Sequence, residues 1–426
     1  MSIKHKNKIE ELFVAIDKTA EADNRAAILK MIAFVLAVLL CGVYVFNVFQ
    51  IKDDKQGKQI WNSFYQEKEN TLDGLYIGSS SVYMFWMPTK AYSKYGYCIP
   101  SLATSAQSIA TEKYIMEEAL RTQPGIKVFF VDIRNISRPA EGMTEGDVRQ
   151  VTDCIKTREI REKAIDSALT YYKKMGADID YDKNDYINSF LFYHNRWAAD
   201  LGPRDFKVWG VNNKYKGFVI NGRGYEKIHL EKPADVKGTT KLAKVQIDTL
   251  NDLLDYCDSI KQKVIFVSSP YATDSVEKRQ ILNTAHKMIR KRGYEVWDFN
   301  HEPLLSKVNM NWHKDYFEKT HTNVYGAQKF TRFMARRIHK RLDLPDHRGS
   351  ADYVSWDKAA SDLNQELKIK GDGQGKPVSE RYIINPMEYA VIYSLDSAGI
   401  NYHSIVDKAK AKEAKEAKEK EEKEEY

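Results

Sequence analysis

Two short motifs, far apart in the chain, carry the residue types that could do covalent chemistry. Positions 78–81 read Gly-Ser-Ser-Ser and follow an apolar segment at residues 72–77. A strand there would place hydroxyl groups at its carboxyl end, where open α/β sheets hold their sites. Positions 318–321 read Glu-Lys-Thr-His, just ahead of an expected helix. Glu318 can hold His321 in one tautomer while His321 takes a proton from a hydroxyl, so the motifs together predict a serine nucleophile with its base and orienting acid.

Each motif on its own is also compatible with a plainer structure. Gly-Ser-Ser is common in loops and in phosphate-binding turns, although no Gly-Lys-Ser/Thr follows, which excludes a P-loop. Thr320 or Thr322 could simply cap the following helix, which would leave His321 as a surface residue. The catalytic interpretation therefore depends on the two motifs meeting in space.

The composition indicates a globular body and excludes several classes of protein. The chain has 426 residues, 43% of them hydrophobic, and 26 tyrosines, which is typical of a protein with a packed core. Its net charge of +7 is spread over scattered lysines and a mixed-charge tail, so we expect no nucleic-acid partner. The cysteines and histidines show no metal-ligand spacing, so we expect no metal or cofactor, and only one disulfide remains possible.

An uncharged apolar run at residues 31–51 predicts one N-terminal transmembrane helix, because its length matches the ~30 Å hydrocarbon core of a bilayer. A cleaved signal peptide would have a shorter apolar region and a small-residue cleavage pattern after Phe49, and a buried core helix would show a polar face. Lysine and arginine are more numerous before the run than after it. We therefore expect a single-pass protein of the cell membrane with a cytoplasmic N-terminus and an extracytoplasmic catalytic domain.

Continuous apolar strands alternate with helices along the middle of the chain, which predicts an α/β fold, a three-layer α/β/α sandwich with a parallel sheet. The expected strands are residues 72–77, 127–133, 263–270 and 294–299, and the expected helices are residues 108–121, 157–175, 240–259 and 276–292.

Changes in composition divide the chain into segments. We expect a cytoplasmic segment at 1–30, the anchor at 31–51, a catalytic domain at 70–345 with an insertion or lid at about 140–235, a C-terminal extension at 346–406 and a solvated Lys/Glu/Ala tail at 407–426.

The surroundings of both motifs resemble the SGNH/GDSL hydrolase superfamily, and more specifically its membrane-anchored DltD-like group. In that group a Gly-Ser-Ser block carries the nucleophile, and here Gly78-Ser79-Ser80 fits it with Ser80 in that role. The last block of the superfamily is Asp-x-x-His, often followed by Asn-x-x-Gly. Glu318, His321, Asn323 and Gly326 fit this block, with Glu in place of Asp. The resemblance covers about residues 70–345 and implies an SGNH hydrolase-like fold.

The resemblance also implies an oxyanion hole. The amide of Ser81, beside the nucleophile, is one implied donor. The second block normally supplies a glycine amide, and Ala106 or Ser105 stands near that position within residues 101–107. The third block supplies an asparagine side chain, for which Asn135 is the nearest candidate, without the usual preceding glycine. Loss of one such donor typically costs about 10²–10³ in rate.

The resemblance implies a membrane-anchored, extracytoplasmic serine esterase or O-acyltransferase that acts on a cell-envelope glycan or polymer through an acyl-Ser80 intermediate. It also implies a polytopic membrane O-acyltransferase as a partner. The rival hypothesis is a catalytically inactive binding or assembly protein of the envelope that kept the SGNH fold. Arg196 and Trp197 could grip an anionic or sugar substrate, or could be a packed tryptophan beside an exposed arginine.

Overall fold

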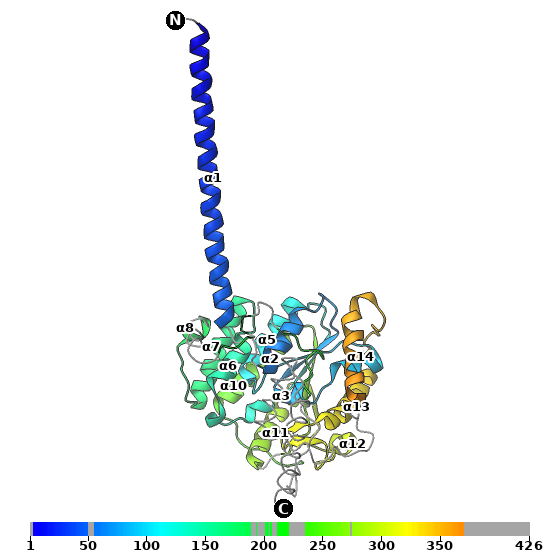
Figure 1. Ribbon diagram of the computed structural model, residues 1–426. Coiled ribbons are helices and arrows are strands. Elements are labelled where there is room, and N and C mark those ends of the chain that lie inside the picture. The colour runs from blue at the N-terminus through cyan, green and yellow to red at the C-terminus, as the bar shows by residue number, and fades with distance from the viewer. Residues whose placement is uncertain are drawn as a thin grey trace, which may run out of the picture.

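The structure is a computed structural model, and it describes residues 3–49, 55–188, 193, 201–203, 205–206, 211–220, 235–272 and 275–369. A long helix, α1 (Ile3–Phe49), stands out from a compact body (Figure 1). An 18-residue window of its segment Asn24–Phe49 has a mean hydropathy of 2.6, and the segment is long and apolar enough to cross a membrane, a property that signal sequences share. Near the body, Val48 is buried, so the last turn of α1 packs on the rest of the chain.

Five strands form one sheet in the order β2-β1-β3-β4-β5, and every neighbouring pair is parallel. Strands β1 and β3 are buried along their whole length, as expected of a sheet covered on both faces. The predicted α/β fold with a parallel sheet is therefore confirmed. The strands are β1 (Gly74–Gly78), β2 (Ser101–Ala103), β3 (Val128–Val131), β4 (Lys263–Ser268) and β5 (Glu295–Asp298).

Helices cover both faces of the sheet. Besides α1 they are α2 (Lys55–Tyr65), α3 (Ser80–Tyr83), α4 (Pro88–Tyr95), α5 (Ile109–Thr122), α6 (Glu145–Thr152), α7 (Arg158–Met175), α8 (Lys183–Ile187), α10 (Lys244–Ser259), α11 (Val276–Lys291), α12 (Leu304–Val308), α13 (Val324–Arg341) and α14 (Val354–Ile369).

The strand order explains which helices share a face. The chain moves from β1 outward to β2 and then returns past β1 to β3, so right-handed crossovers put the two connections on opposite faces. Helices α5, α7 and α10 pack together, whereas α4 packs with α13 and α14. Figure 1 shows these two groups on opposite sides of the body. The strand order reverses at β1, and the carboxyl end of the strand at such a reversal is the usual place for a site in these sheets.

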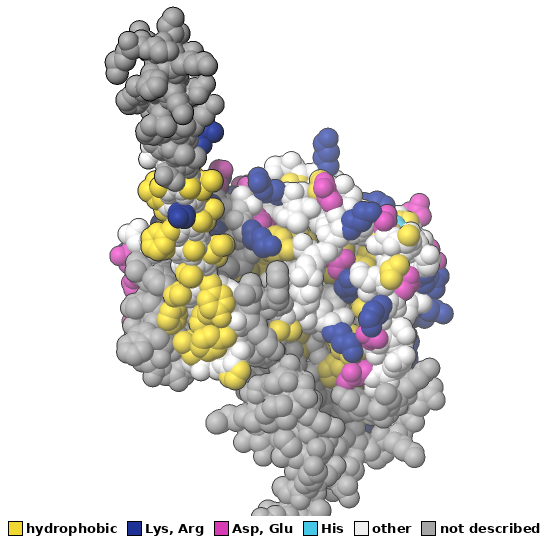
Figure 2. Space-filling model, turned by 45° about the horizontal axis from the view of Figure 1, so that its top comes forward, with side chains coloured by type: hydrophobic (Ala, Val, Ile, Leu, Met, Phe, Trp, Pro, Cys, Tyr) yellow, Lys and Arg dark blue, Asp and Glu magenta, His cyan; other side chains and the backbone are white. Residues whose placement is uncertain are grey.

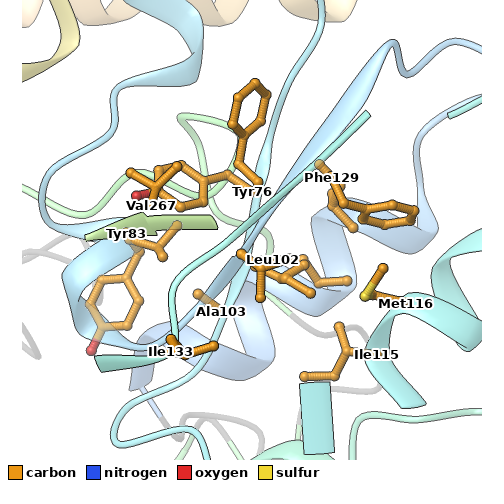
Figure 3. Packing of buried hydrophobic residues seen from close by; sticks show 14 of the residues in the cluster. Tyr76, Tyr83, Leu102, Ala103, Ile115, Met116, Phe129, Ile133 and Val267 are labelled. Carbon is orange, nitrogen blue, oxygen red and sulfur yellow. The ribbon is translucent and has the colours of Figure 1, made fainter. Parts of the chain in front are cut away.

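One part of the core lies between the sheet and α5. Figure 3 shows Leu102 of β2 and Phe129 of β3 beside Ile115 and Met116 of α5, and all four side chains are fully buried. Burial of each such side chain contributes about 1.5–3 kcal/mol. Helix α5 begins where the Ser108 hydroxyl accepts a hydrogen bond from the Ala110 amide. This packing holds the strand ends in a fixed register.

The structure adds elements to those expected from the sequence. Strand β2 was not predicted, and the four predicted strands are one to three residues shorter in total length than expected. Lys216 belongs to the expected insertion, and its carbonyl accepts a hydrogen bond from the amide of Ser101 in β2. Residues near 216 therefore lie along the edge of the sheet. In the expected C-terminal extension, Trp356 and Leu363 of α14 are buried against the body.

Candidate active site

The turn after β1 requires its glycine. Gly78 has φ +147°, and a Cβ there would lie 2.8 Å from Val82 Cγ2 and 2.9 Å from Asp132 Cβ. The chain then enters α3, whose first residue is Ser80. The hydroxyls of Ser79 and Ser81 lie 2.9 Å apart and bond to each other. Because these two hydroxyls pair with each other, the hydroxyl of Ser80 is the one in this motif that can bond to another element.

A two-stranded antiparallel hairpin, β6 (Tyr316–Glu318) and β7 (His321–Thr322), carries the second motif. Its register pairs Glu318 with His321, so the acid and the base lie side by side across the turn. Asn323 then caps α13 by accepting hydrogen bonds from the amides of Tyr325 and Gly326. Gly326 is required because a Cβ there would lie 2.0 Å from the Asp315 carbonyl oxygen. The Asn-x-x-Gly pattern is thus a device that starts α13 immediately after the histidine.

The two motifs meet at the carboxyl edge of the sheet. His321 Nε2 lies 2.6 Å from Ser80 Oγ, within hydrogen-bond distance. His321 Nδ1 is hydrogen-bonded to Glu318 Oε1 on its other side. The predicted proximity of Ser80, His321 and Glu318 is therefore confirmed. The alternative in which Thr320 or Thr322 only caps a helix and His321 is a lone surface residue does not describe this arrangement.

The charge state of the acid fixes the tautomer of the base. Burial raises the pKa of the Glu318 carboxyl, but the hydrogen bond and charge of His321 and the hydrogen bonds of Thr320 outweigh it, so the pKa is lowered overall. An ionised carboxylate can only accept, so Nδ1 of His321 must donate. In the neutral imidazole Nε2 is then the acceptor for the Ser80 hydroxyl proton. This is the arrangement that activates a serine nucleophile.

Arg134 fixes the hairpin to the sheet, and the sequence analysis missed it. It is the first residue of the 3-10 helix Arg134–Ser137, and its amide donates to Asp132 at 2.7 Å. Its guanidinium Nη1 donates to the Thr320 carbonyl at 3.0 Å, and its Cζ lies 4.8 Å from the centre of the Tyr271 ring. The Ala272 amide also donates to the carbonyl of Lys319, which ties the hairpin to the end of β4.

The implied oxyanion residues lie in two neighbouring segments. Ala106 has φ +52°, a left-handed conformation that favours glycine. Asn135 Nδ2 donates to the Gln107 carbonyl at 2.8 Å, so the structure brings Asn135 against the turn that contains Ala106. Ser81 is fully buried beside Ser80, and its carbonyl accepts from Ser269 Oγ at 3.0 Å. A role for Ser81, Ala106 and Asn135 toward an oxyanion stays a prediction.

A buried polar network supports the Ala106 turn, and the sequence analysis missed it too. Gln107 Nε2 donates to both carboxyl oxygens of Glu112, at 3.1 and 3.0 Å, and Gln107 Oε1 accepts from the Thr104 amide at 3.1 Å. Burial raises the pKa of the Glu112 carboxyl well above its ordinary value, although the hydrogen bond from Gln107 lowers it in part. The network fixes the Gln107 backbone, whose carbonyl holds Asn135.

A second chain of serine, histidine and aspartate is sealed in the core. Ser268 Oγ lies 3.0 Å from His286 Nε2, and His286 Nδ1 lies 3.1 Å from Asp298 Oδ2. All three residues are buried, so a substrate has no access to Ser268. Burial raises the pKa of Asp298, but the charge and hydrogen bond of His286 outweigh it and lower the pKa overall. This chain connects β4, α11 and β5 and is structural.

Arg196 and Trp197 lie outside the described residues. In the part of the chain that the structure describes, no group of three or more His, Cys, Asp or Glu side chains could hold a metal ion. Comparison of the chain with models of known protein families and with curated proteins finds no match.

Proposed function

We propose that this chain is a serine esterase or O-acyltransferase with an SGNH hydrolase-like fold, in which Ser80 forms an acyl-enzyme. One observation carries the proposal: Ser80, His321 and Glu318 form a continuous hydrogen-bonded chain at the carboxyl end of β1. The orienting acid, the base and the hydroxyl stand in the order that nucleophilic catalysis requires. The resemblance of both motifs to the superfamily supports the same function.

The geometry supports a two-step reaction. Ser80 Oγ attacks the carbonyl carbon of an ester while His321 Nε2 takes the hydroxyl proton, and Glu318 stabilises the imidazolium that forms. The proton then passes from His321 to the leaving alkoxide as the ester C–O bond breaks, which leaves an acyl-Ser80 ester. Water or a sugar hydroxyl attacks this ester, gives its proton to His321, and releases Ser80 as the proton returns to Oγ. Amides beside Ser80, with Ala106 and Asn135, would bind the oxyanion.

The proposed place of action is the outer surface of the cell membrane. Helix α1 would be the anchor, since its segment Asn24–Phe49 is long and apolar enough to span a bilayer. The excess of lysine and arginine before it favours a cytoplasmic N-terminus. The resemblance to the DltD-like group favours an envelope polysaccharide or polymer as the substrate and a polytopic membrane O-acyltransferase as the partner.

A second function is favoured by the oxyanion side of the site. Ala106 takes the place of the glycine of the second block, and the Asn135 side chain donates to the Gln107 carbonyl. A site with a weakened oxyanion hole would be a poor catalyst. The alternative is therefore a catalytically inactive binding or assembly protein of the envelope.

Trapping the acyl-enzyme separates the two functions. We would incubate the wild-type chain with a short-chain aryl ester, quench it with acid and map the acylated peptide by mass spectrometry. The proposal predicts an acyl group on the Ser80 peptide, no acyl group there in Ser80→Ala, and an unchanged signal in the matched control Ser93→Ala on α4. A folded wild type that turns over no ester and carries no acyl group would favour the binding protein.

A further inference from the structure

The junction between α1 and the body contains a contact that lies within the apolar span. The Tyr44 hydroxyl donates to the carbonyl oxygen of Phe206 at 3.2 Å, and Phe206 belongs to the segment between α8 and α10. Tyr44 lies inside the span Asn24–Phe49, five residues before its end. A helix rises 1.5 Å per residue, so Tyr44 is about 7–8 Å inside that end.

The hydrocarbon region of the bilayer must extend along α1 past Tyr44, toward the body. The uncharged run starts after Lys30, and a bilayer core of ~30 Å needs about 20 helical residues. Counted from Met31, that length extends to about residue 50, beyond Tyr44. The carbonyl of Phe206 is therefore held at a depth that belongs to the membrane rather than to the water above it.

The segment that reaches this depth is folded so that its apolar side chain points outward. The Asp205 amide donates to the Gly202 carbonyl at 3.0 Å, and the Gly202 amide donates to Asp205 Oδ2 at 2.9 Å, which closes a turn. Asp205 is buried, whereas Phe206 is 53% exposed beside α1. Figure 2 shows the hydrophobic side chains of α1 continuing down to the body. Phe206 thus presents a large apolar ring next to the span, while the neighbouring Asp205 is buried.

We propose that Phe206 inserts into the interfacial region of the lipid bilayer, as a membrane contact separate from α1. The depth of Tyr44 matches the ~5–10 Å to which interfacial segments enter a bilayer. Val211 is also exposed, and its carbonyl accepts a hydrogen bond from Asn62 of α2. Two attachments fix the orientation of the body on the membrane. The inference rests on the anchor included in the proposed function.

Helix α2 connects the membrane-facing part of the chain with the candidate site. Gly57 packs so closely on Thr104 that a Cβ at Gly57 would lie 3.0 Å from the threonine methyl group. Thr104 begins the turn that contains Ala106, so this side of the site is connected to the segment that follows the span. A body held at two points keeps this turn at one height above the lipid surface.

Depth-dependent quenching tests the insertion with the full chain in proteoliposomes. A cysteine in Phe206→Cys, made in a Cys41→Ala background, would carry an environment-sensitive fluorophore, while lipids with nitroxides in the headgroup or along the acyl chain act as quenchers. Val276→Cys and Val354→Cys are matched controls, since both valines are exposed elsewhere on the body. The native Cys41, exposed on α1, reports the anchor in the otherwise wild-type chain, and the other three cysteines are buried.

We expect the label at position 206 to be quenched several-fold more than those at 276 and 354, most strongly by headgroup and shallow acyl nitroxides. Equal quenching at all three body positions would overturn the inference. Quenching at Cys41 without quenching at position 206 would also overturn it while the anchor stands. No quenching at Cys41 would contradict the anchor itself, and the inference with it.

Discussion

Replacement of Glu318 by glutamine tests how the site controls the tautomer of His321. The Thr320 amide donates to one carboxyl oxygen of Glu318 at 3.0 Å, and the other oxygen faces His321 Nδ1. In Glu318→Gln the amide oxygen would take the position that accepts from Thr320, so its NH₂ group would face Nδ1. Nδ1 would then become an acceptor, and the proton would move to Nε2. His321 could no longer accept a proton from Ser80.

The expected magnitude follows from this wrong tautomer. In a trypsin-like triad the same exchange of acid for amide costs about 10⁴ in turnover. Here the side chains of His321 and Glu318 are 23% and 31% exposed, so water can replace part of the lost interaction. We therefore expect turnover to fall about 10³-fold, which is ~4 kcal/mol of activation free energy. The folded state should lose little, because the new amide keeps the hydrogen bond from Thr320.

The assay compares turnover of a short-chain aryl ester and melting temperature in wild type, Glu318→Gln, Ser80→Ala and the double variant. The effects of substitutions in residues that act as a unit are not additive. Adding Glu318→Gln to Ser80→Ala should therefore leave the residual rate of Ser80→Ala almost unchanged. Glu159→Gln is the matched control, since Glu159 is exposed on α7 and pairs only with a surface lysine. It should keep wild-type turnover.

Wild-type turnover in Glu318→Gln would refute this reasoning and leave a dyad of Ser80 and His321. A fall in melting temperature that accounts for the whole loss of activity would instead make Glu318 a structural residue.

Three further perturbations test other parts of the account. Arg134→Lys removes the planar guanidinium that donates to the Thr320 carbonyl and stacks on Tyr271. We expect kcat for the aryl ester to fall roughly 10–100-fold with KM nearly unchanged. An unchanged kcat would show that the position of the hairpin does not depend on Arg134. Burial raises the pKa of Glu112 in the folded state. The protonated Glu112 side chain therefore contributes fully to the free energy of unfolding below the unfolded-state pKa of 4.5, and this contribution is lost as the pH rises. Glu112→Gln should therefore gain melting temperature relative to wild type as the pH rises above about 5, and a constant difference would contradict this. External protease added to intact spheroplasts should remove the C-terminal tail, residues 407–426, whereas protection until lysis would reverse the proposed orientation.

The sheet could be predicted because its central strands are continuous apolar runs followed by helices. Val128–Val131 and Lys263–Ser268 carry this signal clearly. Strand β2 gave no such signal, because Ser101–Ala103 is too short for a run or an alternation to stand out. The hairpin of Glu318 and His321 was expected only as a turn into a helix, since β6 and β7 are equally short.

The candidate triad could be predicted because each motif has a fixed local spacing. The residues that support it could not, because their contacts join segments with no sequence pattern in common. Arg134 meets the carbonyl of Thr320, which is 186 residues away. Gln107 and Glu112 were hidden for a different reason, since polar residues near the start of a helix normally indicate a solvated face. Only packing shows that both are buried.

The central claim, that Ser80 is an activated nucleophile, is tested most directly by a fluorophosphonate probe. The probe bonds to a serine hydroxyl only when a neighbouring base removes its proton, so labelling reports the contact between Ser80 and His321 without knowledge of the natural substrate. The account predicts one label per chain, mapped by mass spectrometry to the peptide with Ser80 and lost in both Ser80→Ala and His321→Ala. A folded wild-type chain that takes up no label, or a label that persists in Ser80→Ala, would contradict it.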